Sequence, residues 1–211
     1  LNRLSYENYE VWISDNTRGR KYYHELKRRT KHNDKFNIIH SARYDNSRQA
    51  QANSLNDLRD IFLKGDYDYF LSIESDLMVP VDIVQRLIKH DVDVVGSIYL
   101  IGYEWSKKQP PRPCLFSERI NKEGKWETYN LDPNTGFSFF GHGLVKIHGM
   151  GIGCTLIKRN IIEKYTWKFD NRKPIKHSDV LFFMELRRDG YNVYVDTDCM
   201  IPHHNSDWNQ V

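Results

Sequence analysis

The first half of the chain alternates between strand-like and helix-like hydrophobic patterns. Strands are predicted where apolar residues alternate with polar ones or run together, over residues 9–14, 36–40, 67–73 and 92–100. Helices are predicted between them where apolar residues recur at helical spacing, over residues 21–29, around Leu55–Phe62 with a stop at Gly65, and over 81–89. This β-α-β-α-β order predicts an α/β fold in which helices flank a largely parallel sheet.

The second half adds shorter and more varied elements. The pattern predicts a hairpin over 115–131 with its turn at Asn121–Gly124, a strand from Cys154, a helix that opens at Ser178–Asp179 and a last strand from Tyr191. No stretch of linker-like composition separates the two parts. Residues 1–211 are therefore predicted to form one domain, with halves of about 1–100 and about 101–211.

Gly149, Gly151 and Gly153 form a second conspicuous pattern, G-x-G-x-G. The dinucleotide-binding fingerprint needs G-x-G-x-x-G at the opening of a helix, whereas this run leads into the strand-like Cys154–Ile157. We therefore expect the glycines to allow a close backbone approach, either beside a bulky ligand or at a bend in the sheet.

Composition and the lack of certain motifs argue against several classes of function. The net charge is only +3, and no zinc-finger, RNP or helix-turn-helix motif accompanies the basic residues between Arg18 and Lys31, so no nucleic-acid partner is predicted. No run approaches the ~18 apolar residues of a membrane span, and Leu1–Leu4 opens no signal peptide. Three widely spaced cysteines indicate neither a disulfide framework nor a zinc site. We expect a soluble protein in the reducing cytoplasm.

The main candidate chemistry is a pair of carboxylates, Glu74 and Asp76, directly after the strand predicted to end at Ile73. Ligands of parallel α/β sheets bind outside the carboxyl ends of the strands, where Asp15 also lies. Hard carboxylate oxygens suit Mg²⁺ or Mn²⁺, which usually completes its shell with substrate phosphates. The alternative for an isolated E-x-D is a solvated acidic turn.

Two residues near the end of the chain could join this chemistry. Asp179 lies in the first turn of a predicted helix, where it is either a catalytic carboxylate or a residue that caps the helix and compensates its dipole. His203 and His204 follow the last strand, and such a pair is more often at the surface than bound to metal. The carboxylate pair elsewhere favours His203 as a third ligand.

The order of these motifs resembles the family 2-type glycosyltransferases of GT-A fold over nearly the whole chain. The resemblance rests on a strand ending in Asp15, Arg48 before a helix, Glu74-Ser75-Asp76 at a strand end, Gly149–Arg159, Ser178-Asp179 and Gly190–Asp196 leading to His203. It also extends to the small GT-A modules of the glycosyltransferases of large DNA viruses.

The resemblance implies a role for each residue. The D-x-D motif maps onto Glu74, Ser75 and Asp76, with Mn²⁺ or Mg²⁺ held on the donor diphosphate by Glu74, Asp76 and His203. Asp15 would contact the base of a UDP donor, and Asn16, Arg48 and Ser75 would belong to the same donor-binding site. Asp179 matches the general base of inverting members. The first half, about 1–100, would bind the nucleotide sugar and the second half, about 101–211, the acceptor.

Three departures accompany the resemblance. Glu74 replaces the usual first aspartate, and no acidic residue precedes Asp179 where the family often has one. Members also open with a strand and loop that wall the nucleotide pocket, and no residues before Leu1 supply them. Either the chain begins late or the pocket is built differently.

The sequence therefore predicts a metal-dependent, inverting hexosyl- or deoxyhexosyltransferase. It would move a sugar from a UDP-linked donor to a hydroxyl of a glycan or glycoprotein acceptor. Two alternatives stay open. A nucleotidyltransferase acting on a sugar phosphate would consume a triphosphate and release pyrophosphate, and a noncatalytic sugar-binding module would show no metal-dependent nucleotide binding.

Overall fold

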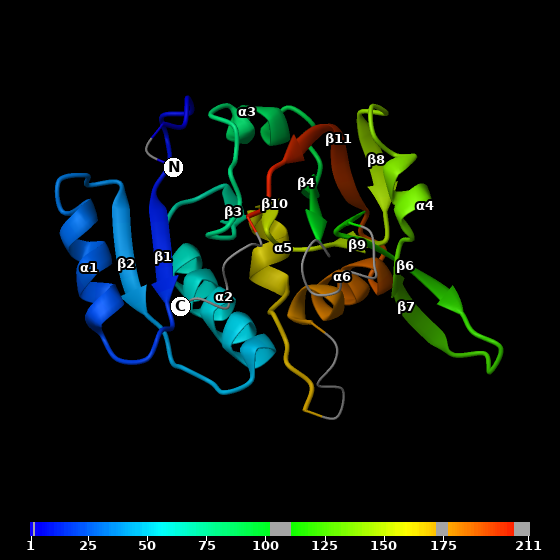
Figure 1. Cartoon of the computed structure of the whole chain (residues 1–211), viewed down its shortest axis with the longest axis horizontal. Helices are drawn as coiled ribbons and strands as arrows, with labels where there is room; N and C mark the ends of the chain where they lie inside the picture. Colours follow the sequence, from blue (N-terminus) through cyan, green and yellow to red (C-terminus); the bar gives the residue numbers. More distant parts are fainter. Residues whose placement is uncertain (2, 102–110, 172–176, 205–211) are drawn as a thin grey trace.

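The computed structural model describes residues 1, 3–101, 111–171 and 177–204. Its first part has β1 (Val11–Asp15), α1 (Lys21–Thr30), β2 (Phe36–His40), α2 (Ser47–Lys64), β3 (Tyr69–Ile73), α3 (Ile83–Ile88) and β4 (Val94–Ile101). These bounds confirm the predicted strands and helices to within a few residues, except that α2 begins at Ser47, well before the predicted Leu55. The α/β class is confirmed as well (Figure 1).

The second part contains mostly short elements. They are β5 (Arg112–Pro113), β6 (Leu115–Ile120), β7 (Trp126–Asn130), α4 (Pro133–Phe137), β8 (Leu144–Ile147), β9 (Gly149–Met150), β10 (Cys154–Lys158), α5 (Arg159–Lys164), α6 (Ser178–Arg188) and β11 (Val193–Ile201). The predicted hairpin is confirmed as β6 and β7, which pair antiparallel around a turn where Asn121 Oδ1 accepts from the backbone N–H of Glu123 and of Lys125.

The main sheet has the strand order β3-β10-β4-β11-β8, with β5 paired to β4 at one side. β3 and β4 are each antiparallel to β10, and β11 is parallel to β4, so β3, β4 and β11 all point the same way. The expectation of largely parallel pairing is corrected in one respect. β10 enters from the second half of the chain and separates β3 from β4, because a strand pattern does not specify which neighbour a strand will choose.

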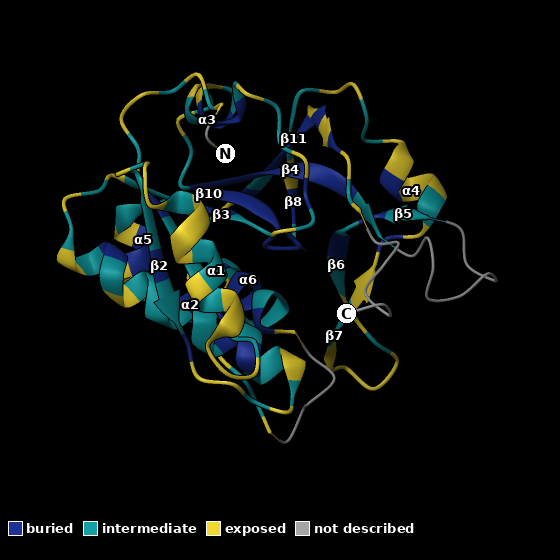
Figure 2. Ribbon diagram, turned by 60° about the vertical axis from the view of Figure 1, so that its left-hand side comes forward, coloured by how far each residue is buried: buried dark blue, intermediate teal, exposed yellow. Residues whose placement is uncertain are grey.

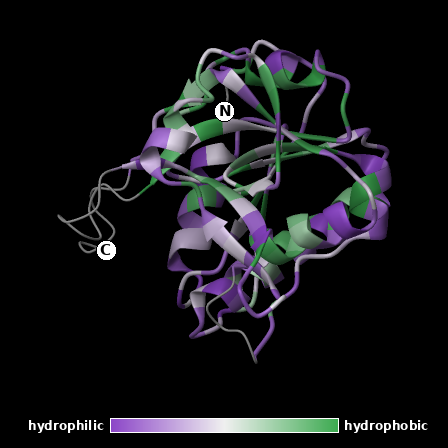
Figure 3. Ribbon diagram, turned by 90° about the vertical axis from the view of Figure 1, so that its right-hand side faces the viewer, coloured by the Kyte–Doolittle hydropathy of each residue, from purple (hydrophilic) through white to green (hydrophobic). Residues whose placement is uncertain are grey.

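Helices cover both faces of this sheet. In Figure 1, α3 lies above the strands and α2, α5 and α6 lie below them. β4 is buried on both sides, and its side chains alternate between two hydrophobic clusters: Val94 and Ile98 pack with α2, α5 and α6, whereas Val95 and Tyr99 pack with α3. Figure 2 shows the central strands as the most buried elements, and Figure 3 shows apolar residues concentrated on them.

A separate pair of strands lies beside the main sheet. β1 and β2 pair parallel with each other, in register from Val11 with Phe36 to Asp15 with His40. Among the described residues, no strand pairing joins β1 to β3. None of the described helices combines the length and the apolar character that crossing a bilayer would require.

Candidate metal and donor site

Glu74 and Asp76 follow β3, as the sequence predicts, and the chain after β11 lies against them. Glu74 donates its backbone N–H to Gly153 O (2.8 Å), which extends the pairing between β3 and β10. Leu77 and His203 form an isolated antiparallel bridge, and the backbone N–H of His204 donates to Asp76 O (2.9 Å). This bridge brings the predicted third ligand to the carboxylates from 127 positions along the chain.

Glu74, Asp76 and His203 can each offer one ligand atom such that these atoms all lie within 4.8 Å of one another. His203 Nδ1 lies 2.8 Å from Leu100 O, a carbonyl that can only accept, so Nδ1 carries the proton. In the neutral ring Nε2 then has a lone pair, yet it lies 2.9 Å from Asp76 Oδ2. Two acceptors at this distance need a proton or a cation between them. The donor set therefore fits a divalent ion, with the histidine oriented by a backbone carbonyl.

The two histidines differ in burial and in what their ring nitrogens contact. His203 is largely buried, whereas His204 is exposed and its Nε2 faces Met78 Sδ. We therefore expect His203→Ala to weaken Mn²⁺-dependent nucleotide binding by at least roughly 10-fold, because losing even an outer-shell partner of a metal ligand costs roughly 10- to 100-fold. Calorimetric titration of UDP in Mn²⁺ into His203→Ala and into His204→Ala measures the effect. An effect confined to His204→Ala would contradict the assignment.

Glu74 lies in a strongly perturbed environment. Burial raises the pKa of its carboxyl group to about 7, and the negative charges of Asp76 and Asp179 add to the effect. A cation at the cluster would offset both causes, because it stabilises the carboxylate form.

The same pKa predicts a pH dependence of metal binding. Glu74 must lose its proton to bind an ion, and its pKa of about 7 means that the acid form dominates at pH 6 and the carboxylate at pH 8. Protons and metal compete, so we expect the Mn²⁺ affinity to be about tenfold higher at pH 8 than at pH 6. Titrations at the two pH values measure this, and equal affinities would contradict it.

Gln51 connects the candidate metal site to α6, and no motif in the sequence points to it. Its Nε2 donates to Glu74 Oε1 (3.3 Å), while its Oε1 accepts from Ser178 Oγ (3.2 Å). A single glutamine in a helix usually lies on the solvated face. The only signal for Gln51 in the sequence is its place in the second turn of α2. That helix begins after Asn46, whose side chain caps it by accepting from the N–H of Arg48 and of Gln49.

Asp179 lies beside the same cluster. It is in the first turn of α6, where its Oδ1 accepts from the N–H of Val180 (2.7 Å). Burial raises the pKa of the Asp179 carboxyl group. Its charge in turn raises the pKa of Glu74, so the two carboxyl groups are electrostatic neighbours. A carboxylate with a raised pKa at such a place can accept a proton more readily than an exposed aspartate.

The glycine run provides the close backbone approach that the sequence predicts. A Cβ on Gly153 would lie 2.7 Å from Glu74 Oε2 and 2.8 Å from Tyr99 Oη, and one on Gly151 would lie 1.9 Å from Tyr99 Oη. The Tyr99 hydroxyl accepts from the N–H of Gly153 (3.2 Å) and is fully buried, so it has little room to yield. The main chain of this run therefore forms a wall of the metal cluster.

We expect Gly153→Ala to weaken Mn²⁺ binding by roughly tenfold, because the new methyl group displaces the Glu74 carboxylate. Gly65→Ala is the matched control, since its Cβ would meet the Tyr67 ring at 2.2 Å, before β3 begins, rather than Glu74. Calorimetry measures the affinity, and thermal melting shows whether both variants fold. Equal Mn²⁺ affinity in the two variants would contradict this role.

The residues predicted to bind the nucleotide lie at the end of β1, at the start of α2 and just after β3. Asp15 is buried at the end of β1, where it accepts from Thr17 N (3.1 Å) and contacts His40 Nδ1 (3.1 Å). Asn16 donates to Ser54 Oγ on α2 (3.3 Å). Arg48 lies in the first turn of α2 and Ser75 is exposed between the two carboxylates. Asp15 is not among the residues that the structure gathers at the metal cluster, and its contact with a base stays a prediction.

No protein-family model matches the chain, and no curated protein matches it significantly. Among solved structures, GalNAc-T7 with UDP, GalNAc and Mn²⁺ aligns with 92% of this chain at a TM-score of 0.60 and 13% sequence identity. The chain has a GT-A-like fold. It covers 37% of GalNAc-T7, and at this identity the likeness concerns the fold alone. Protein A197 from STIV aligns over 93% of this chain and 95% of its own, at a TM-score of 0.45 and 16% identity. Membership of family 2 stays a prediction.

Proposed function

We propose that the protein is a metal-dependent glycosyltransferase that uses a UDP-linked sugar. The observation that carries the proposal is the convergence of Glu74, Asp76 and His203, in which His203 Nε2 lies 2.9 Å from Asp76 Oδ2. Its place at the carboxyl end of β3 is where α/β sheets bind their ligands. The GT-A-like fold supports transfer of a sugar, and the UDP and Mn²⁺ of GalNAc-T7 support the choice of donor and ion.

Glu74, Asp76 and His203 would hold the ion, either Mn²⁺ or Mg²⁺. When bound, the ion supplies positive charge for the phosphates of the leaving nucleotide. The Leu100 carbonyl fixes the ring of His203, and Gln51 holds the Glu74 carboxylate from the side. These contacts orient two of the three ligands before any ion binds, which lowers the cost of assembling the site.

Asp179 would act as the general base. Its carboxylate accepts the proton of the acceptor hydroxyl, which is a group on a glycan or glycoprotein, while the oxygen attacks the anomeric carbon of the donor. Burial raises the pKa of Asp179, which strengthens it as a proton acceptor, and the N–H of Val180 holds its Oδ1. Direct displacement by that oxygen inverts the configuration at the anomeric carbon.

An assay of nucleotide release tests this function against its alternatives. The protein is incubated with Mn²⁺ and UDP-hexoses or UDP-deoxyhexoses, with and without simple glycan acceptors, and released UDP is quantified. We expect release of UDP that EDTA abolishes. Release of pyrophosphate from a nucleoside triphosphate and a sugar phosphate would instead identify a nucleotidyltransferase. Sugar binding with neither reaction would identify a binding module.

A further inference from the structure

Positive charge is concentrated in one short segment of the chain. Of the 31 Lys and Arg residues of the protein, seven lie within residues 18–32, which contain one acidic residue, Glu25. The segment alone is therefore more positive than the whole chain, whose net charge is +3, so the rest of the protein is net negative. All seven cationic side chains are exposed. We call residues 18–32 the basic segment; its cations are Arg18, Arg20, Lys21, Lys27, Arg28, Arg29 and Lys31.

The helix of this segment, α1, has two different sides. Tyr23, Leu26 and Thr30 recur at helical spacing and are partly buried, and the Tyr23 ring packs edge-on against His40 of β2 (5.9 Å between ring centroids). In Figure 1, α1 lies at one end of the long axis of the protein, outside β2. The outward side of the helix is polar and carries Lys21, His24, Lys27, Arg28 and Lys31.

Positive charge at the start of α1 works against the helix. The amide dipoles of a helix favour acidic residues in its first turn, yet the first turn of α1 has none. The N-cap residue Arg20 makes no capping hydrogen bond with its side chain, and Lys21, the first residue of the helix, adds a second cation at this unfavourable end. These two side chains therefore do not serve the stability of α1.

Most of the charge of the basic segment is not neutralised within the protein. Glu25 is shared between Arg28 (2.8 Å) and Arg29 (2.6 Å). Four further cations form no ion pair with any residue that the structure describes: Arg20, Lys21, Lys27 and Lys31. Exposed cations that have no partner of this kind, and that in part disfavour their own helix, indicate an anionic partner outside the chain.

We propose that the basic segment docks the protein on a lipid bilayer whose surface carries anionic phospholipid headgroups. Clusters of roughly four to eight Lys and Arg residues on an amphipathic helix bind such surfaces, because each cation gains from the negative surface potential. A bilayer is flat and anionic throughout, so one outward side of a helix is enough to meet it. The Tyr22 side chain is 53% exposed and lies two helical turns before Arg29, on the same side, where a ring with a polar end suits the headgroup level.

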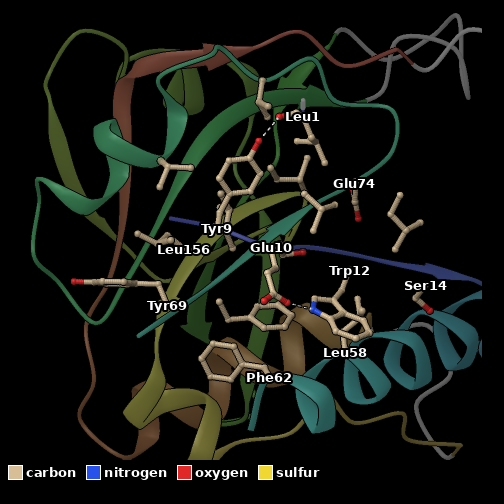
Figure 4. A pocket seen from close by; sticks show the side chains of 18 of the residues that line it. Leu1, Tyr9, Glu10, Trp12, Ser14, Leu58, Phe62, Tyr69, Glu74 and Leu156 are labelled. Atoms are coloured by element: carbon tan, nitrogen blue, oxygen red, sulfur yellow. Dashed lines mark hydrogen bonds between the residues drawn. The ribbon is translucent and has the colours of Figure 1, made fainter. Parts of the chain in front are cut away.

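Docking through this segment would place the candidate site close to the membrane. The basic segment begins at Arg18, shortly after Asp15, the last residue of β1. Ser14 of β1 and Glu74 line one cavity of about 1780 Å³, so β1 connects the basic segment to the surroundings of the metal cluster (Figure 4). The inference goes beyond the proposed transferase activity and does not rest on it, because docking depends on the charge and exposure of residues 18–32 alone.

Co-sedimentation with sucrose-loaded vesicles tests the proposal. One set of vesicles contains phosphatidylcholine with roughly one third phosphatidylserine, and the other contains phosphatidylcholine alone. At about 0.1 M salt we expect the protein to bind the anionic vesicles and not the neutral ones. At about 1 M salt this binding should be lost, because the Debye length falls from ~10 Å to ~3 Å.

Two triple variants with the same loss of charge locate the docking surface. Lys21→Gln, Lys27→Gln and Lys31→Gln together should lower the affinity for anionic vesicles about 100-fold, because each cation near such a surface contributes about fivefold. The matched control combines three lysines that are also exposed but lie outside the basic segment, and its affinity should not change. These substitutions are Lys64→Gln, Lys89→Gln and Lys122→Gln.

Thermal melting shows whether both triple variants fold. Neither of them removes a residue of the candidate site, so vesicle docking and UDP binding can fail independently of each other. The proposal is overturned if the two triple variants bind vesicles alike, if neutral vesicles bind as well as anionic ones, or if neither kind binds. It is also overturned if a short DNA duplex binds more tightly than the vesicles at the same phosphate concentration, which would identify nucleic acid as the partner.

Discussion

Replacing Asp179 by Asn should lower turnover by about 10²- to 10⁴-fold, the usual contribution of a positioned general base. Asparagine keeps the shape of the side chain and can still accept the N–H of Val180, so the first turn of α6 is preserved. What it loses is the ability to take the acceptor proton. We therefore expect normal folding and normal Mn²⁺-dependent UDP binding in this variant.

Steady-state transfer assays on Asp179→Asn and on Asp189→Asn measure the effect. Asp189 lies at the other end of the same helix, where it accepts from the Tyr165 hydroxyl away from the cluster, so its variant should keep its turnover. Near-normal transfer by folded Asp179→Asn would show that this residue only caps the helix. A product that retains the anomeric configuration would count equally against it, because the base role and inversion stand together.

Asp76→Ala should abolish metal-dependent nucleotide binding. Losing an outer-shell partner of a metal ligand already costs roughly 10- to 100-fold in affinity, so removing a ligand that faces His203 Nε2 should cost at least about 100-fold. Glu74→Ala should weaken binding less, because part of the Glu74 charge is already lost to its raised pKa. Calorimetric titration of UDP in Mn²⁺ measures both variants.

The exposed Glu123, in the turn of the β6–β7 hairpin, provides the control for charge removal. Glu123→Ala removes one negative charge from the protein without touching the cluster, so its UDP affinity should equal that of the unmodified chain. Unchanged Mn²⁺-dependent binding in Asp76→Ala would refute the metal assignment.

The hydrophobic patterns predict the strands and helices well because each of these elements depends on residues that are close together in the sequence. β2 and the opening of α6 are found where the hydrophobic periodicity and the Ser178-Asp179 pattern place them, and Gly65 and Gly190 close the two helices that carry Gln51 and Asp179. Pairing is a long-range property, and it was less predictable. Nothing in Cys154–Lys158 indicates that this strand would lie between β3 and β4.

In the candidate site, too, local patterns indicate some residues, whereas long-range contacts bring in the others. Glu74 and Asp76 could be proposed from the end of one strand, and His203 only because a carboxylate pair elsewhere favoured a further ligand. The bridge from Leu77 to His203, which brings the histidine to Asp76, joins segments that no local pattern connects. Gln51 was missed because a polar residue in a helix has the same appearance whether it faces solvent or a buried carboxylate.

Calorimetric titration of UDP into the protein, with Mn²⁺ and then with EDTA, tests the central claim most directly. In the proposed function the cluster of Glu74, Asp76 and His203 would bind the diphosphate only through an ion, so the account predicts saturable binding in Mn²⁺ and none in EDTA. GDP and CDP titrated in the same way report the preference for the base. Equal UDP affinity in Mn²⁺ and in EDTA, or no UDP binding in either, would contradict the account.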